Sequence, residues 1–387
     1  MSHATTVLGV SIDGFAVEGG YDVEEGPATT FGVAQALGKI PASVRSTGTW
    51  DHLDELVGYA ADLGFKELRL TVEWARLERR PDQRDDEALE RYLRALRAAA
   101  DRGLTSVVVL CDAALPSWTG AEPWLSAWAP GRFAAHAGWV AQHVEGLARA
   151  IVTFRSPNAT AREGWRTGTR PPFRRDAGAD AVSALDGMLV AHQLALHEIA
   201  LAAPTVERAL LMEAGREYDD ESLWRDLASG VADPVLLAAR ADRFGAVARG
   251  AVAMRAFARP GAASLRRTVT GLRSTTRWGD IPPFSWWLAS DDPDVLASSL
   301  EFAAGAVDTV ELGADRFGWD AQLAAGLPAV TAGPHGATTV HLTGLVGSTG
   351  PLAAPAGLLD VDQHDGTWAV ADGHGGVARR LAAFHAG

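Results

Sequence analysis

The sequence contains very little cysteine and no long uninterrupted apolar run. Its 387 residues include a single cysteine, Cys111, so a disulfide within the chain is impossible and a reducing, cytoplasmic location is expected. No run of roughly 18 apolar residues occurs, so no membrane-spanning helix is expected. The segment 1–6 lacks a basic patch followed by an apolar stretch, so no signal peptide is expected either.

Basic residues are also in the minority. The chain has 35 Lys and Arg against 48 Asp and Glu, a formal net charge of -13. This acidic balance argues against nonspecific binding to nucleic acid and against docking on an anionic membrane. With 47% hydrophobic and 21% charged residues, the composition is that of a globular protein with an ample core. Nothing in the composition indicates an oligomeric state.

Recognisable cofactor and metal motifs are missing. Gly14, Gly19 and Gly20 do not form the G-x-G-x-x-G loop that cradles a dinucleotide. No H-E-x-x-H segment and no cluster of Cys and His with zinc-ligand spacing occurs. We therefore expect no cofactor and no dedicated metal site.

Short β-rich runs alternate with longer helical patterns. Strands are predicted at 7–11, 68–72, 106–110, 150–154, 206–212, 307–312, 329–331 and 339–345. Helices are predicted at 53–63, 88–100, 132–148, 182–202 and 234–257, with an irregular segment at 258–292. The first half alone fits a doubly wound sheet or a barrel. Eight strands favour a (β/α)8 barrel, and without a repeat or linker we expect one domain over residues 1–387.

One segment resembles a known catalytic motif. The fourth predicted strand runs into Thr153-Phe154-Arg155-Ser156-Pro157-Asn158. This segment resembles the Thr-Phe-Asn-Glu-Pro-Asn signature of glycoside hydrolase family 1, the β-glucosidase family. In that family the Glu is the acid/base catalyst. The resemblance places Ser156 at the catalytic position and Arg155 at the Asn before it.

Further segments resemble the same family in order and spacing. Residues 68–76 resemble Tyr-Arg-Phe-Ser-Ile-Ser-Trp-Pro-Arg, which puts Arg69 at the family's site arginine. Residues 109–116 resemble Thr-Leu-Tyr-His-Trp-Asp-Leu-Pro, with Asp112 at the sugar-binding His and Ala113 at the Trp. The sugar-binding Gln of the first strand is Ala16. Positions with a packing role are kept, among them Trp74, Arg76, Pro116, Trp124, Pro157 and Gly164.

The resemblance also locates the family's nucleophile. Residues 326–331 resemble Gly-Leu-Pro-Pro-Ile-Tyr-Ile-Thr, after which the nucleophilic Glu is expected, but Ala332-Gly333 follow. A retaining glycosidase needs two carboxyl groups about 5 Å apart, one as nucleophile and one as acid/base. Neither Ser156 nor Ala332 supplies one, so conventional β-glucosidase activity is not expected.

Other carboxylates near strand ends could take over the chemistry. The catalytic candidates are Asp112, Glu213, Glu311, Asp315 and His335. Alternation along the strand places Glu311 and Gly313 toward the barrel interior, on the same side as Asp315. The alternative is that these carboxylates only neutralise Arg69 and Arg155. The candidates for binding a ligand are Arg69, Glu73, Asp112, Arg155, Ser156, Trp165 and Asp315.

The arginines and tryptophans near the predicted site suggest which class of ligand it would bind. Six arginines crowd the segment 155–175, and guanidinium groups suit anionic ligands; the alternative is a solvated loop with salt bridges. Trp165 and the pair Trp286-Trp287 could form a ligand wall, with packing as the alternative. Three function classes stay open: a repurposed barrel that binds or transforms an anionic or sugar-derived small molecule, a glycosidase with relocated carboxylates, and a noncatalytic regulatory partner.

Overall fold

Eight parallel strands close into a barrel, which confirms the predicted (β/α)8 fold. The computed structural model describes residues 6–21, 26–40, 47–213, 284–303, 309–313, 322–332 and 336–346, with the short stretches 282, 307, 358–359, 361–364, 367–370 and 381. The barrel strands, in order around the ring, are β1 (Val7–Ile12), β2 (Glu67–Thr71), β5 (Thr105–Val109), β6 (Ala150–Arg155), β7 (Glu207–Glu213), β8 (Ser285–Ser290), β9 (Thr309–Leu312) and β10 (Thr339–Leu342).

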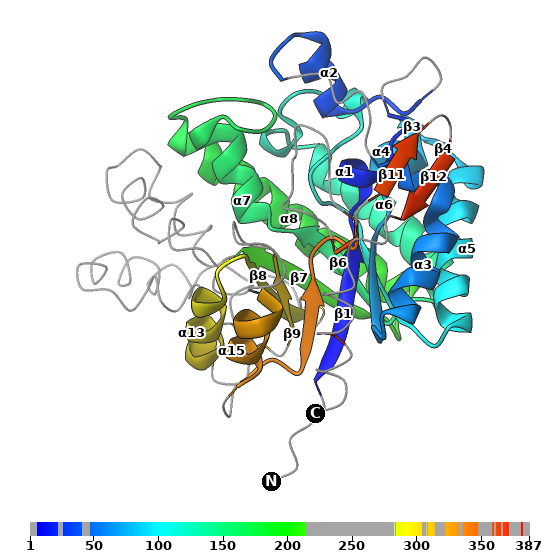
Figure 1. Cartoon of the computed structure of the whole chain (residues 1–387). Helices are drawn as coiled ribbons and strands as arrows, with labels where there is room; N and C mark the ends of the chain where they lie inside the picture. The colour runs from blue at the N-terminus through cyan, green and yellow to red at the C-terminus, as the bar shows by residue number, and fades with distance from the viewer. Residues whose placement is uncertain are drawn as a thin grey trace.

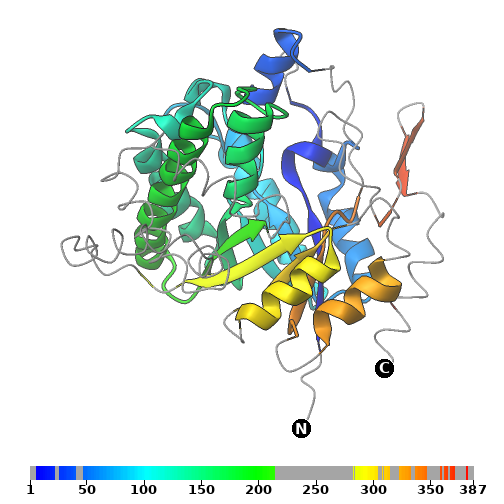
Figure 2. The ribbon, with the colours of Figure 1, turned by 90° about the vertical axis from the view of Figure 1, so that its left-hand side faces the viewer.

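Helices surround the barrel. The longer ones are α3 (Leu53–Asp62), α5 (Asp86–Asp101), α6 (Ala129–Val144), α8 (Gly178–Ala202) and α13 (Pro293–Ala303). Short helices follow several strands: α1 (Gly14–Glu18), α2 (Thr30–Ala36), α4 (Trp74–Leu77), α7 (Pro157–Arg162) and α15 (Leu327–Thr331). In Figure 1, β1 rises toward α1, so the carboxyl ends of the strands lie at the upper side of that view. Figure 2 shows α13 and α15 outside β8 and β9.

Single turns and two small hairpins complete the described structure. The turns are η1 (Thr49–His52), η2 (Ser117–Thr119), η3 (Pro123–Leu125), η4 (Glu163–Thr167) and η5 (Gln322–Gly326). The hairpins are β3 (Glu78–Arg80) with β4 (Gln83–Arg84), and β11 (Val361–His364) with β12 (Thr367–Val370). Among the described helices, none is both long enough and apolar enough to cross a lipid bilayer.

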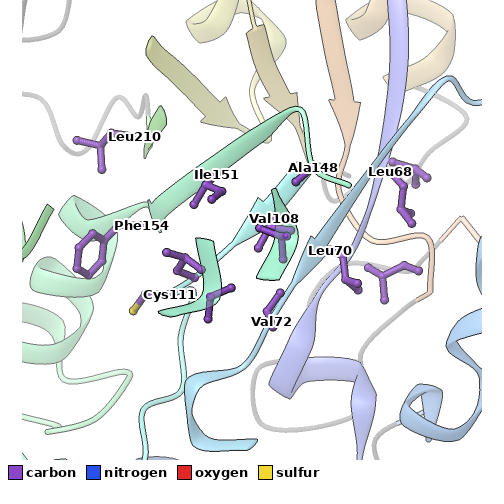
Figure 3. Packing of buried hydrophobic residues seen from close by; sticks show 14 of the residues in the cluster. Leu68, Leu70, Val72, Val108, Cys111, Ala148, Ile151, Phe154 and Leu210 are labelled. Carbon is purple, nitrogen blue, oxygen red and sulfur yellow. The ribbon is translucent and has the colours of Figure 1, made fainter. Parts of the chain in front are cut away.

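Alternation along the strands builds two apolar layers. One set of side chains fills the barrel and includes Val107, Val152 and Trp287. The neighbouring side chains point outward and pack under the helices. Figure 3 shows part of this outer layer, with Leu68 and Leu70 of β2 near Val108 of β5. The barrel interior is therefore a packed core, and a cavity lies at its mouth.

Two predicted elements are wrong. The segment predicted as irregular contains the sixth barrel strand, β8, which pairs with β7 on one side and β9 on the other. The predicted strand at 329–331 is instead the end of helix α15, in which Pro328 occupies the first turn. Short apolar runs do not distinguish strand from helix, and Pro is tolerated in a helix's first turn because no amide is needed there. The predicted helix 234–257 lies outside the described residues.

Candidate functional site

A cavity of about 290 Å³ lies at the mouth of the barrel, where the active sites of such barrels are found. Residues at or just past the carboxyl ends of seven of the eight strands line it. They are Asp13 after β1, Asp112 after β5, Arg155 at the end of β6 and Ser156 after it, Glu213 of β7, Ser290 at the end of β8 and Asp291 after it, Glu311 of β9 and Gly313 after it, and Thr343 after β10. Helix α7 and the loop after it add Ala159, Thr160, Glu163 and Arg170.

Glu311 is the most heavily contacted of these side chains. Its Oε1 accepts hydrogen bonds from Arg155 Nε at 2.9 Å and from Thr343 Oγ1 at 2.8 Å. Its other carboxylate oxygen forms an ion pair with Arg69, whose side chain is buried below the cavity floor. Burial and the nearby Arg155 lower the pKa of Arg69 to about 10, which still leaves it charged at neutral pH. The alternation that predicted an inward-facing Glu311 and Gly313 is confirmed.

Arg155 crosses the cavity between two strands. Its guanidinium contacts Glu311 on β9 and donates from Nη1 to Asp112 Oδ1 at 3.2 Å. Burial by itself would lower the pKa of Arg155, but Asp112 and Asp13 outweigh it and hold the pKa above its ordinary value. Arg155 is therefore a fixed cation within the cavity, and it bridges two carboxylates, Asp112 and Glu311, that lie far apart in the sequence.

A bulge in β6 aims Arg155 into the cavity. In the pairing with β7, Val152 lies opposite Ala209 and Arg155 opposite Leu211, so β6 carries one extra residue. Val152 points into the barrel, whereas Thr153 hydrogen-bonds His192 of α8 and Phe154 packs in the outer layer. Regular alternation would have turned Arg155 outward, since it lies three residues after Val152.

A second ion-pair group lines the other side of the cavity. Arg162 donates to Glu213 Oε1 at 3.1 Å and to Glu163 Oε1 at 3.2 Å. Arg170 also forms an ion pair with Glu163. Asn158, kept from the family signature, joins the end of β7 to α7 through two hydrogen bonds with the backbone of Glu213. All of the arginines that line or underlie the cavity are thus engaged by carboxylates.

Ser156 stands where the resemblance places the acid/base catalyst, and the cavity confirms that this position faces the mouth. Its backbone is left-handed, with a φ of 52°. A serine hydroxyl can donate a hydrogen bond, but it is too weak an acid to serve as a general acid near neutral pH. The neighbouring carboxylates that could replace it, Glu163 and Glu213, are each ion-paired to arginine.

The segment that the resemblance places before the nucleophile is not a barrel strand. The resemblance puts the nucleophile directly after Thr331, at the end of the segment predicted from the sequence to be a strand, 329–331. In the structure that segment is helical, and Ala332 follows helix α15 instead of a barrel strand. The seventh barrel strand is β9, and the carboxylate on it that faces the cavity is Glu311.

Other predicted site residues lie away from the mouth cavity. Glu73 is buried and accepts a hydrogen bond from the Phe15 amide at 2.7 Å; burial and Glu18 raise its pKa well above the ordinary value. Trp165 is buried and donates to Glu122 at 3.0 Å. Trp287 packs inside the barrel, 5.5 Å from the His341 ring. Asp315, Gly333 and His335 lie outside the described residues, and so does the side chain of Trp286.

Among the lining residues that sequence reasoning missed are Ser290, Asp291 and Thr343. The first two lie at the end of β8, which was hidden in the segment predicted as irregular. A strand assignment there would have found them, because polar residues directly after a barrel strand point to the mouth. Thr343 lay inside a strand predicted to run to residue 345, whereas β10 ends at Leu342.

The cavity carries an excess of carboxylates. Six line it, namely Asp13, Asp112, Glu163, Glu213, Asp291 and Glu311, together with two guanidinium groups, Arg155 and Arg170. Arg69 and Arg162 do not line the cavity, but they add two positive charges next to it through ion pairs with the lining residues Asp13 and Glu213. Six negative and four positive groups leave a formal charge of -2. Among the described residues no group of three or more His, Cys, Asp or Glu side chains is arranged to hold a metal ion.

Comparisons with known proteins agree on the fold. No model of a protein family matches the sequence, and no curated protein is similar to it in sequence. Solved structures do match: the AHE enzyme from Alicyclobacillus herbarius has a TM-score of 0.71 at 15% identity, covering 98% of both chains. A family 1 β-glucosidase from Thermotoga maritima, in complex with isofagomine lactam, has a TM-score of 0.71 at 14% identity, again covering 98% of both.

The β-glycosidase from Thermosphaera aggregans is similar to the same degree, with a TM-score of 0.71 at 15% identity over 98% of this chain and 96% of that one. The likeness extends over nearly the whole length of each protein. At identities this low, the similarity shows the fold alone, and the chemistry has to be argued from the residues of the site. The chain has the barrel fold of the family 1 β-glycosidases, as its motifs predicted.

Proposed function

We propose that this chain, with the fold of a family 1 β-glycosidase, uses the mouth of its barrel to bind a small hydroxylated molecule that bears an amine. The observation that carries the proposal is the balance of charge in the cavity, in which six carboxylates face two lining arginines. Carboxylates accept hydrogen bonds and attract cations. A ligand that donates hydrogen bonds and carries a positive charge complements this lining.

The ion pairs weigh against an anionic ligand. The expectation of anion binding depended on arginines gathered near the site. Arg155 already contacts Asp112 and Glu311, and Arg162 contacts Glu163 and Glu213. An anion would have to displace these carboxylates from their partners, leaving several of them uncompensated in a partly buried site.

The lining also favours polar contacts with a ligand over stacking against an aromatic face. None of the described residues that line the mouth cavity is aromatic, whereas sugar sites commonly stack rings against aromatic faces. Alanines occupy four lining positions, Ala16, Ala113, Ala159 and Ala289, and they leave open volume instead of filling it. This supports an accessible binding cavity over a plugged, purely regulatory barrel.

Ligand-dependent melting tests the proposal. Glucosamine, glucose and glucose 6-phosphate are compared at equal concentration and ionic strength. Glucosamine is expected to raise the melting temperature most, and Glu213→Gln to reduce that shift because one lining carboxylate is lost. Glu145→Gln, outside the cavity, is the matched control and is expected to leave the shift unchanged. A larger shift with glucose 6-phosphate would overturn the proposal and restore the anionic ligand.

Glycoside hydrolysis is the second candidate, favoured by the place of Glu311 on the seventh strand. A retaining mechanism would pair it with a proton donor about 5 Å away, for which Glu213, Glu163 and Asp112 compete. Assays with aryl β-glycosides decide this. Hydrolysis that is abolished by Glu311→Gln would establish the second candidate, and absence of turnover in the unaltered protein would remove it.

A further inference from the structure

A second, smaller cavity opens beside the mouth cavity. Its volume is about 30 Å³, and it shares three wall residues with the mouth cavity: Asp112, Ala113 and Thr160. We call this smaller cavity the side pocket. Its remaining walls include Cys111, Ala121, Trp124, Phe154, Trp165 and Met188. The shared residues place the side pocket directly against the carboxylate-lined cavity.

The two cavities have opposite chemistry. Three buried aromatic rings, those of Trp124, Phe154 and Trp165, form much of the side pocket, whereas the described lining of the mouth cavity has none. Trp124 and Phe154 meet edge to face with centroids 5.3 Å apart. The indole nitrogen of Trp165 is already bonded to Glu122, so its polar group is satisfied without a ligand. Figure 3 shows Cys111, just past the end of β5, and Phe154 of β6 in the outer layer.

Close backbone packing fixes the walls. Helix α8 approaches the turn η3 so closely that a Cβ added at Gly187 would lie 2.0 Å from the carbonyl oxygen of Trp124. Glycine at this position therefore brings the next residue, Met188, against the Trp124 side of the side pocket. Both Trp124 and Met188 are buried, so their positions are set by packing. A pocket built this way is preformed, and filling it requires little ordering of the protein.

We infer that the side pocket receives a short, unbranched apolar substituent of the ligand whose amine lies among the mouth carboxylates. This rests on the proposed function and narrows its ligand to an amphiphilic molecule. A volume of about 30 Å³ exceeds the roughly 10–15 Å³ that a single water needs, so a methyl or ethyl group fits. Water gains few partners in an aromatic pocket, so an alkyl group is the favoured occupant.

A series of alkylammonium ions tests the inference on the full chain. Dissociation constants are measured by titration calorimetry for methyl-, ethyl-, propyl-, butyl- and pentylammonium. Each methylene that enters the side pocket is expected to tighten binding about fourfold, until the pocket is full. Longer chains are then expected to give no further gain.

Two variants alter the side pocket without touching the mouth cavity. Met188→Ala enlarges it, so the gain is expected to continue for one or two more methylenes. Ala121→Leu shrinks it, so the gain is expected to stop earlier. Methylammonium, which is too short to reach the pocket, is expected to bind both variants as it binds the unaltered protein.

The single cysteine gives a second readout. Cys111 lines the side pocket, so the rate of its alkylation by iodoacetamide, followed by mass spectrometry, reports access to that pocket. Butylammonium is expected to slow the alkylation several-fold and methylammonium to leave it unchanged. Methylammonium binding without any dependence on chain length would overturn the inference and leave the proposed function standing. If no ammonium ion binds and none protects Cys111, both are overturned.

Discussion

Asn158 connects the carboxyl end of β7 to the start of α7 through both the nitrogen and the oxygen of its side-chain amide. Its Nδ2 donates to the Glu213 carbonyl at 2.7 Å, and its Oδ1 accepts from the Glu213 amide at 3.0 Å. Asn158 is fully buried, whereas the Glu213 side chain reaches the cavity. A residue kept from the catalytic signature thus holds a carboxylate of the present cavity in place.

Replacing this amide is expected to destabilise the protein. Asn158→Leu leaves the partly buried backbone groups of Glu213 without their partner, and each unsatisfied group costs about 1–3 kcal/mol. Urea unfolding measures the loss. Thr169→Ala, which removes an exposed hydroxyl contact with Thr167, is the control and is expected to change the free energy of unfolding by less than about 0.5 kcal/mol. Equal effects of the two substitutions would contradict the structural role of Asn158.

The buried pair of Arg69 and Glu311 should show strong coupling. Their side chains are 1% and 2% exposed, so removing one leaves the other charge buried. Arg69→Leu is expected to lower the free energy of unfolding by about 3–5 kcal/mol. The double variant Arg69→Leu/Glu311→Leu is expected to lose less free energy of unfolding than the two single variants together. In each single variant one charge stays buried without its partner, whereas the double variant removes both charges. Additive losses in a double-mutant cycle would show that the two groups do not interact.

Because His192 is buried, we expect the protein to lose stability at acidic pH. Burial lowers its pKa to about 3 from an ordinary value of 6.5, and its Nδ1 is bonded to Thr153. Below pH 6.5 the unfolded chain takes up a proton that the folded chain refuses until about pH 3, so stability falls as the pH drops through this window. The slope for one such group is about 1.4 kcal/mol per pH unit.

The variant His192→Gln removes this proton and is expected to flatten the pH dependence of the free energy of unfolding between pH 6 and 4, by about that slope. His197→Gln changes an exposed histidine on the same helix and serves as the control. The same pH profile for the unaltered protein and His192→Gln would rule out this account of the acid sensitivity.

Gly187 and Gly131 make a matched pair of helix glycines. Alanine normally stabilises a helix by up to about 1 kcal/mol relative to glycine. At Gly131 of α6 a Cβ would meet nothing within 4 Å, so Gly131→Ala is expected to raise the melting temperature slightly. At Gly187 the Cβ would collide with the Trp124 backbone, so Gly187→Ala is expected to lower it by several degrees and to disturb the side pocket. Stabilisation by both substitutions would contradict the close packing of α8 on η3.

Much of the fold could be predicted from local pattern. Runs such as 68–72 and 106–110 are short, apolar and followed by helical periodicity, and their structure differs from the prediction by one residue at either end. The pattern failed at 285–290 and 329–331. The first is a strand because it pairs with β7 and β9, which no local signal records. The second is too short and apolar to distinguish the two states.

The candidate site was predicted in part. Asp112, Arg155, Ser156, Glu213 and Glu311 all line one cavity, as expected of residues at strand ends. The resemblance assigned the nucleophile position to Ala332 from the motif at 326–331, whereas the carboxylate that faces the cavity on the seventh barrel strand, β9, is Glu311. Motif matching by itself could not find this, since the residue order around a barrel depends on which segments pair.

The sequence by itself predicted a (β/α)8 barrel with seven of its eight strands in place, a serine at the position that the resemblance assigns to the acid/base catalyst, and the acidic character of the chain, because alternation, motif spacing and composition are all local properties. Only the tertiary structure decided what Arg155 does. One extra residue in β6 turns its side chain into the barrel, where carboxylates from β5 and β9 engage it. An arginine that suggests an anion site in sequence is thereby neutralised, and this neutralisation supports the proposal that the cavity binds a positively charged ligand.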